Sequence, residues 1–478
     1  MKVRIVLSPG WRSHTGPMTA GSELDVLIVE TPSLGDRCYV VHDGSVGVVI
    51  DPPRDIDRVL AELDAASVRL THVLETHVHN DYVTGGLALA RRTGAEYVLC
   101  ADDDVRFERR GVADGDEIVT GSLTIRAVHT PGHTHTHLSY VVSDRTGEPQ
   151  AVFTGGSLLY GTVGRTDLLG EADTEELTRA QYRSGRRLVE ELADDVAVYP
   201  THGFGSFCAS SGGGDRTAGT IADERIDNLV VTIDDEDRFV ERLLAGLTEY
   251  PAYYAHMSLL NLSGPFEAGL APPVPVEADE LRRRLEAGEW VVDLRSKKAF
   301  AADHLTGSVG VELDDQFSTY VGWLIPWGSR LTLLAANPEG VVSAQRQLVR
   351  IGLDQLGGAA TGELDEAATG IPRSVYRVTD FVGLAAAMER GEAPVVVDVR
   401  RRDEWQSGHV EGARNLPLHE LVTHFHHALG GELWVHCASG YRASIAASLL
   451  ARARFPVVLV DDEFDRAEAA GLTIVRSS

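Results

Sequence analysis

Two segments of the C-terminal half carry the same residue pattern at a constant offset of 105 positions. An apolar strand ending in Asp-x-Arg, followed by an aromatic residue, a histidine and a glycine, spans residues 291–307 and again residues 396–412. In both copies short apolar strands alternate with helical segments, which favours a small parallel sheet covered by helices. The repeat therefore predicts two α/β domains of related fold, at residues 276–362 and 372–478.

The two copies differ at the position where a reactive side chain is expected. In the second copy a predicted strand leads into Cys437-Ala-Ser-Gly-Tyr-Arg442 and then into a helix, whereas the first copy has Ala335 at the matching place. A thiol at a helix start faces backbone N–H groups that stabilise a thiolate or an anionic adduct. Arg442 adds a fixed positive charge. We therefore predict that Cys437 is a nucleophile and that the first copy has none.

The N-terminal half contains a histidine-rich turn. An apolar run at residues 70–74, a predicted buried strand, leads into Thr76-His-Val-His-Asn-Asp-Tyr82. Imidazoles and a carboxylate at alternate positions can meet at one transition metal, although an isolated His-x-His is more often a polar loop. Further predicted strands end in polar turns at residues 129–134, 154–157 and 200–203. This repetition predicts a layered αββα sandwich with a site along one edge.

Composition narrows the classes of partner. The 478-residue chain has a formal net charge of −27 and no basic run, which disfavours nucleic acid and anionic membranes as partners. Its four widely spaced cysteines predict neither a disulfide framework nor a zinc ribbon. No apolar run approaches the ~20 residues of a membrane span, and no leader pattern is visible at the start, so the cytoplasm is the expected compartment. A Pro/Gly-rich linker is predicted at residues 266–275.

The motifs of the N-terminal half, in their order, resemble those of the metallo-β-lactamase superfamily. They are Thr76-His-x-His-x-Asp81, Pro131-Gly-His133-Thr, Gly164-Arg-Thr-Asp167 and Pro200-Thr-His202-Gly. Within that superfamily the pattern is similar to glyoxalase II and to persulfide dioxygenases, including those fused to rhodaneses. The resemblance implies a metallo-β-lactamase-like domain at residues 1–265 with one metal ion per chain. The ligands expected for that ion are His77, His79 and His133.

Two departures from the superfamily affect this expectation. Tyr82 occupies the place of a histidine that helps the binuclear hydrolases hold a second metal, so a two-zinc hydrolase is disfavoured. The persulfide dioxygenases hold iron with two histidines and an aspartate, and that aspartate corresponds to Gly156. Asp81 and His202 are left as further candidate ligands. The metal expected is Fe(II), with Zn(II) as the alternative, and Gly156→Asp is expected to raise iron occupancy.

The repeat of the C-terminal half resembles a rhodanese pair, an inactive domain at 276–362 and an active one at 372–478. The matching motifs are Asp398-Val-Arg, Gly408-His-Val-Glu-Gly412 and the loop with four residues between Cys437 and Arg442. Protein tyrosine phosphatases place five residues there, so the shorter loop favours sulfur transfer. The resemblance implies Cys437, Arg442 and Asp398 as catalytic residues.

Together the two resemblances imply persulfide-handling sulfur metabolism. A low-molecular-weight persulfide would be oxidised by O2 to sulfite at the metal, and sulfane sulfur would be transferred through Cys437. The expected partners are a small-molecule persulfide or thiol and sulfite, and a homo-oligomer is compatible with the sequence. Two alternatives remain, a single-metal thioesterase of the glyoxalase II type with a rhodanese domain, and a sulfurtransferase with a metal-free N-terminal scaffold.

Overall fold

The computed structural model describes residues 2–6, 24–210, 216–392, 394–424 and 430–476. The chain forms two compact units. The first contains Met1–Gly269 together with Val349–Gly352, and the second contains Leu270–Leu348 together with Leu353–Ser478.

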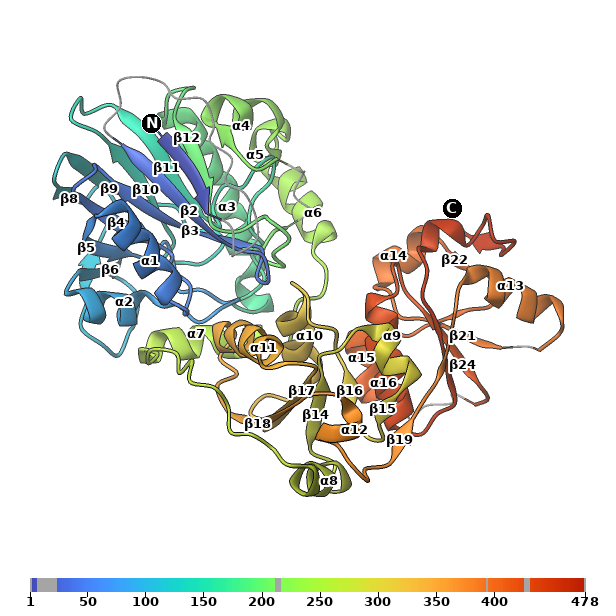
Figure 1. The fold of residues 1–478 in the computed structure, drawn as a ribbon. Helices are drawn as coiled ribbons and strands as arrows, with labels where there is room; N and C mark the ends of the chain where they lie inside the picture. The colour runs from blue at the N-terminus through green and yellow to red at the C-terminus, as the bar shows by residue number, and fades with distance from the viewer. Residues whose placement is uncertain (1, 7–23, 211–215, 393, 425–429, 477–478) are drawn as a thin grey trace. The chain divides into compact units, whose positions relative to one another are not determined.

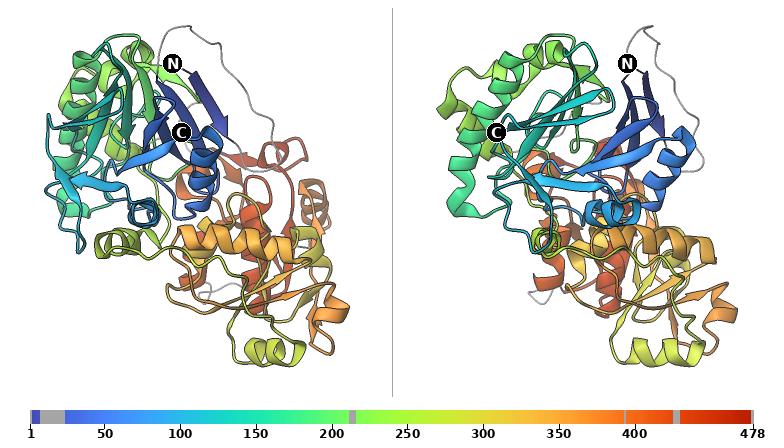
Figure 2. Two further views of the ribbon diagram at one scale, coloured as in Figure 1. Left: turned by 60° about the vertical axis from the view of Figure 1, so that its left-hand side comes forward. Right: turned by 90° about the vertical axis from the view of Figure 1, so that its left-hand side faces the viewer.

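Two sheets face each other in the first unit (Figures 1 and 2). The first sheet has the order β1-β2-β3-β4-β5-β6-β7 and the second the order β13-β12-β11-β10-β9-β8. The strands of the first sheet are β1 (Lys2–Val6), β2 (Asp25–Thr31), β3 (Asp36–His42), β4 (Val46–Ile50), β5 (Arg69–Leu74), β6 (Glu96–Cys100) and β7 (Arg110–Val112). Those of the second are β8 (Glu117–Thr120), β9 (Leu123–His129), β10 (Leu138–Ser143), β11 (Pro149–Gly155), β12 (Ala197–Pro200) and β13 (Gly219–Thr220).

Alternating side chains of the strands bury both faces of each sheet. In β3, Tyr39 and Val41 belong to the core between the sheets, whereas Cys38 and Val40 pack with apolar residues of α1 and α2. A third apolar cluster joins the second sheet to α3 and its neighbours. The predicted αββα sandwich is thereby confirmed. The helices of this unit are α1 (Asp57–Ala66), α2 (Gly86–Thr93), α3 (Glu171–Glu191), α4 (Ile221–Asp227), α5 (Leu229–Thr232), α6 (Glu236–Gly246) and α7 (Tyr254–Ser263).

The second unit contains two parallel sheets, as the repeat predicts. Their orders are β16-β14-β17-β18 and β20-β25-β24-β21-β23, and every pairing within them is parallel. One apolar cluster includes Val292 and Leu333 of the first sheet and Val397 and Val435 of the second, so the halves share a core. The strands of these sheets are β14 (Trp290–Asp293), β16 (Val309–Gly310), β17 (Leu331–Ala335), β18 (Leu356–Thr361), β20 (Arg377–Thr379), β21 (Val395–Asp398), β23 (Arg414–Asn415), β24 (Leu433–His436) and β25 (Val457–Val460). Two short antiparallel pairs accompany them, β15 (His304–Leu305) with β19 (Arg373–Ser374) and β22 (His409–Val410) with β26 (Ile474–Val475).

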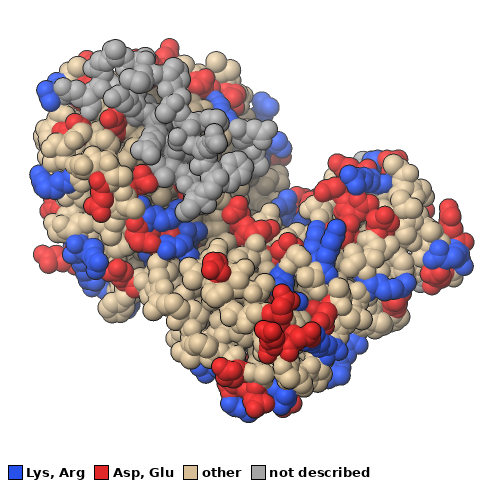
Figure 3. Space-filling model, viewed as in Figure 1, with Lys and Arg blue, Asp and Glu red and all other residues tan. Residues whose placement is uncertain are grey.

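The helices of the second unit are α8 (Ala278–Glu286), α9 (Lys297–Ala302), α10 (Phe317–Leu324), α11 (Pro338–Arg350), α12 (Leu364–Ala367), α13 (Phe381–Glu389), α14 (Arg402–Ser407), α15 (Leu418–His424) and α16 (Tyr441–Arg452), with a short 3-10 helix at Phe464–Arg466. Within the described part of the chain, no helix is both long and apolar enough to cross a bilayer. Acidic and basic side chains are interspersed on the face shown in Figure 3.

Candidate functional site

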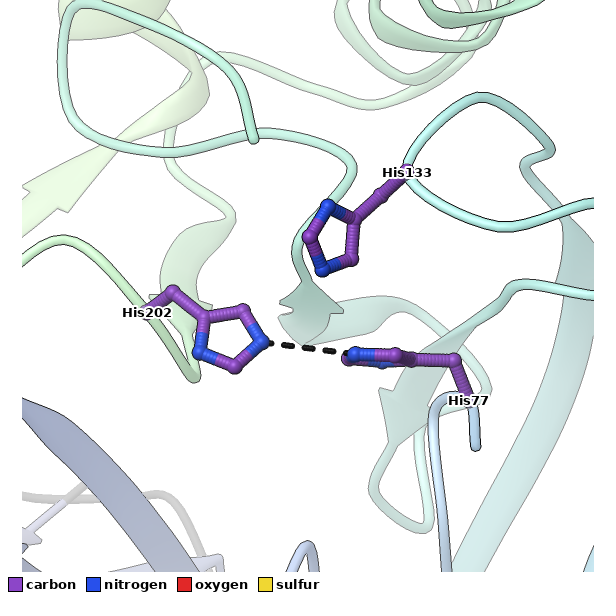
Figure 4. Close-up of side chains that lie close together, drawn as sticks. All are labelled: His77, His133 and His202. Atoms are coloured by element: carbon purple, nitrogen blue, oxygen red, sulfur yellow. Dashed lines mark hydrogen bonds between the residues drawn. The ribbon is translucent and has the colours of Figure 1, made fainter. Parts of the chain in front are cut away.

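Three histidines converge where strands of the two facing sheets end (Figure 4). His77 follows β5, His133 follows β9 and His202 follows β12, and one nitrogen of each lies within 4.8 Å of the others. The Nε2 atoms of His77 and His202 are 3.3 Å apart. Two imidazole nitrogens bound tetrahedrally to one zinc at 2.0–2.1 Å would lie about 3.3 Å apart. The spacing in this three-histidine group therefore fits ligands of a shared metal.

Hydrogen bonds to Nδ1 orient each ring of the three-histidine group. The contacts join His77 to Thr76 Oγ1 at 2.9 Å, His133 to the Arg165 carbonyl at 2.7 Å and His202 to Asp36 Oδ1 at 2.9 Å. Such partners are typical around metal-binding histidines, because they leave Nε2 for the metal. The buried Nε2 of His133 has no hydrogen-bond partner among the described residues. A buried nitrogen without a partner is costly unless something binds it.

Asp51 fixes the tautomer of His77 through Thr76. Both the backbone N–H and the hydroxyl of Thr76 donate to the Asp51 carboxylate at 2.7 Å. Because the hydroxyl proton is committed to Asp51, Thr76 Oγ1 can only accept from Nδ1–H of His77. The lone pair of His77 is then on Nε2, the nitrogen that faces His202.

His79, predicted to share a metal with His77 and His133, lies in a neighbouring group instead. Its Nε2 is 2.9 Å from the Tyr82 hydroxyl, 3.2 Å from Glu75 Oε2 and 3.3 Å from Asp51 Oδ1. Although burial opposes it, the acidic surroundings raise the pKa of His79 to about 9. The structure places His202, not His79, beside His77 and His133, and brings His79 together with Asp51 and Glu75 in a further group that could hold an ion; the predicted role of His79 as a ligand stays a prediction. The two histidines of His-x-His point differently because carboxylates from two strand ends attract the second.

Asp81 and His79 form an overlapping second group with His202. Both oxygens of Asp81 are buried without a hydrogen-bond partner in the described part of the chain, and Oδ2 is 3.3 Å from His202 Nδ1. Despite burial, Asp81 and Asp36 raise the pKa of His202. The same carboxylates would compensate the charge of a cation that displaces the proton from Nε2. Nδ1 of His79 is also buried and unpartnered among the described residues, so it is available to this second group.

Glycines lie on either side of the His133 ring. An ideal Cβ on Gly156 would be 2.4 Å from His133 Cδ2, and one on Gly164 would be 2.9 Å from His133 Nδ1. The ring therefore fills the space where a side chain at position 156 would begin. This crowding argues against the expectation that Gly156→Asp adds a ligand, since the new side chain must first displace His133.

Cys437 lies between β24 and α16 and is 1% exposed. The Gly440 N–H donates to Cys437 Sγ at 3.2 Å, and α16 begins at the next residue. Gly440 adopts φ 86°, where a glycine is favoured, and a Cβ there would collide with the Asp461 carboxylate. The loop thus curls around the sulfur and presents a backbone N–H donor to it at the start of a helix, a setting in which backbone donors can bind an anionic adduct.

Arg442 is held by a carboxylate. Its two terminal nitrogens donate to Glu404 of α14 at 2.6 and 2.7 Å. Burial favours the protonated carboxyl of Glu404, but the hydrogen bonds and charge of Arg442 outweigh it and lower the pKa. The predicted positive charge beside the loop is therefore balanced by a neighbouring negative charge.

Asp398 is engaged with Arg400. Arg400 donates to it from the backbone N–H, Nε and Nη2, at 2.6 to 3.0 Å. Asp293 and Arg295 make the same contacts in the first half, where Ala335 replaces the cysteine. The recurrence of the pair without a nucleophile shows that these contacts fix the turn after the strand in both halves. No hydrogen bond joins Asp398 to Cys437 in the described residues, and the catalytic role expected of Asp398 stays a prediction.

Lys297 belongs to the first half of the repeat and contacts the loop that carries Cys437. The sequence motifs did not identify it as a site residue. Its Nζ donates to the Ser439 carbonyl at 3.3 Å and pairs with Asp461 at 2.5 Å. Tyr441 reaches in the opposite direction and donates to the Glu312 carbonyl at 2.9 Å. Its rarity could have drawn attention to it, because Lys297 is one of only three lysines in the chain.

Two protein families match parts of the chain. Residues 35–203 match the metallo-beta-lactamase superfamily, and residues 382–469 match the rhodanese-like domain. The first range includes the three-histidine group, and the second includes Cys437 and Arg442. In fold, the chain is similar to a metallo-beta-lactamase from Staphylococcus aureus subsp. aureus COL, with a TM-score of 0.64 and 24% identity over 71% of this chain and 99% of that chain.

Curated relatives match the N-terminal part. “Probable polyketide biosynthesis zinc-dependent hydrolase BaeB” of Bacillus velezensis is 30% identical over 35% of this chain and 73% of its own length. A hydroxyacylglutathione hydrolase of Methylococcus capsulatus is 36% identical over 37% of this chain and 66% of its own. The human mitochondrial persulfide dioxygenase ETHE1 is 29% identical over 43% of this chain and 72% of its own. The matches thus span about two thirds of the relatives' length. The chain belongs to the metallo-β-lactamase superfamily and carries a rhodanese-like domain in its C-terminal part.

Proposed function

We propose that the protein handles persulfides and that Cys437 carries sulfane sulfur. The Cys437 thiolate attacks the outer sulfur of a donor persulfide RSSH, the S–S bond breaks, and RS⁻ leaves and takes up the proton. Sulfite or a thiol then accepts the outer sulfur from Cys437, giving thiosulfate or a new persulfide, and the thiolate is restored. The observation that carries the proposal is the Gly440 N–H donated to Cys437 Sγ at the start of α16.

The first test is thiosulfate:cyanide sulfur transfer by the full chain. Cys437→Ser should abolish transfer because a hydroxyl forms no persulfide, whereas Cys100→Ser should retain it. Cys100 is a suitable control because it is another buried cysteine, placed in the first unit. Substantial transfer by Cys437→Ser would refute the assignment.

We further infer that the three-histidine group holds one metal ion. The donor set fits, since three imidazoles are oriented through Nδ1 and the Nε2 of His133 is buried without another partner in the described residues. A bound iron would supply the redox chemistry for RSSH + O2 + H2O → RSH + H2SO3. The residues themselves hold the cation, exclude water by burial, and compensate charge through Asp36 and Asp81.

A zinc-dependent hydrolase is the second candidate for the first unit. It is favoured by the all-nitrogen character of the three-histidine group, because three histidines suit zinc at least as well as iron. Metal analysis of the purified protein, combined with O2 uptake on addition of glutathione persulfide, separates the candidates. Iron with persulfide-dependent O2 uptake supports the dioxygenase, and zinc with thioester hydrolysis supports the hydrolase.

A further inference from the structure

A cavity of about 430 Å³ lies in the second unit at the end of α16 remote from Cys437. Its walls come from the last turn of α8, the turn after β15, the segment at residues 371–372 and the last turn of α16. Cys437 precedes the first turn of the same helix, whose 12 residues span about 18 Å. The cavity is therefore separate from the sulfur-transfer loop, and we refer to it as the arginine cavity.

Three arginines line the arginine cavity, and carboxylates compensate their positive charges only in part. Arg454 is exposed and has no side-chain partner among the described residues. Arg452 donates to the carbonyls of Gly307 at 2.9 Å and Gly288 at 2.7 Å, and its guanidinium carbon lies 4.4 Å from the centroid of the Trp290 ring, so it has no carboxylate partner in the described part of the chain. Carbonyl oxygens orient a guanidinium without neutralising it, and burial lowers the pKa of Arg452.

The remaining charges leave the arginine cavity positive. Arg282 pairs with Asp279 at 3.2 Å, but the side chain of Asp279 is 92% exposed, so that pair is strongly screened by solvent. Glu286 is the single acid among the lining residues and has no ion-pair partner in the described residues. Three arginines against one glutamate stand out in a chain whose net charge is −27.

We propose that the arginine cavity binds a small organic anion that carries two or more phosphate or carboxylate groups. Guanidinium groups bind both types of oxyanion through paired N–H donors. The volume lies in the range of about 300–1,000 Å³ that is usual for metabolite-sized ligands, and a single inorganic phosphate would leave most of it unfilled. A ligand there would touch both halves of the second unit, because α8 and α16 belong to different halves of the repeat.

Calorimetric titration of the full chain at low salt tests this site with ATP, citrate and inorganic phosphate. ATP or citrate should bind at one site per chain and more tightly than phosphate; the stronger of the two shows whether phosphate or carboxylate groups are preferred. Arg454→Ala should weaken that binding about tenfold, because it removes a charged donor. Arg466→Ala removes an exposed arginine elsewhere in the unit and should leave binding unchanged.

Glu286→Gln should have the opposite effect on affinity, since removing the negative charge of the one lining acid should tighten anion binding. The proposal fails if neither ATP nor citrate binds at millimolar concentration or if phosphate binds as tightly as both. It also fails if Arg454→Ala and Arg466→Ala weaken binding equally, or if Glu286→Gln does not tighten it. None of these readouts depends on sulfur transfer, so the site can fail while the proposed function stands.

Discussion

At the scale of single residues, Gly156 and Gly164 set the position of the His133 ring. A Cβ on Gly156 would lie 2.4 Å from the ring, and the Arg165 carbonyl anchors the ring on its other nitrogen. Gly156→Ala should therefore push His133 out of line and weaken metal binding by roughly tenfold or more. Metal content after dialysis against a competing chelator checks this effect.

Gly269→Ala is the matched control for Gly156→Ala, because nothing lies within 4 Å of a Cβ at Gly269. Equal metal retention by the two alanine variants, or a gain of metal in Gly156→Asp, would show that the ring is free to move and that position 156 can supply a ligand.

Sequence spacing could predict part of this site. His77 and His133 were identifiable because each follows an apolar strand and so lies at a sheet edge. Sequence spacing did not indicate that His202, and not His79, lies beside these two histidines. That placement depends on Asp51, Glu75 and Tyr82, which surround the Nε2 of His79. Glu75 and Tyr82 are near neighbours of His79 in the chain, but Asp51 follows β4 and reaches His79 only when β4 and β5 pair.

At the scale of elements, helix α9 brings a lysine of the first half of the repeat to the Cys437 loop of the second half. Lys297 donates to the Ser439 carbonyl and pairs with Asp461, and both partners adjoin the curl around Cys437. Lys297→Ala should loosen the loop and lower kcat for sulfur transfer several-fold, with the free energy of unfolding changed by only about 1 kcal/mol or less.

Lys298→Ala is the matched control, because this neighbouring lysine is exposed and carries the same charge. Partial recovery of kcat in Lys297→Arg would support a positioning role for the cation. The idea would be abandoned if both alanine variants kept full kcat, or if both lost it equally.

The repeat predicted the two parallel sheets of the second unit, because the period-matched Asp-x-Arg strands and the helices between them are local features. It did not predict that the halves share one apolar cluster. That core depends on which helix faces are left uncovered after each sheet forms, and sheet order is decided by packing across long sequence separations.

At the scale of the whole molecule, the residues proposed to bind a metal and Cys437 belong to different compact units with their own apolar cores. We expect the two chemistries to be separable. His202→Ala should lose most of the bound metal, since His202 belongs to two of the three residue groups that could hold an ion, and should keep thiosulfate:cyanide transfer. Cys437→Ser should lose transfer and keep its metal.

His135→Ala is the control for the metal arm of that experiment, because His135 lies in the same turn as His133 with a side chain 49% exposed. Loss of transfer in His202→Ala, at unchanged thermal stability, would show instead that the two chemistries depend on each other.

Intact-mass spectrometry of the full chain after incubation with glutathione persulfide tests the central claim most directly. Cys437 is predicted to gain the mass of one sulfur atom, to release it when sulfite is added with formation of thiosulfate, and to gain nothing in Cys437→Ser. An unmodified Cys437 under these conditions, or a sulfur adduct that sulfite cannot remove, would contradict the assignment of Cys437 as the sulfur carrier.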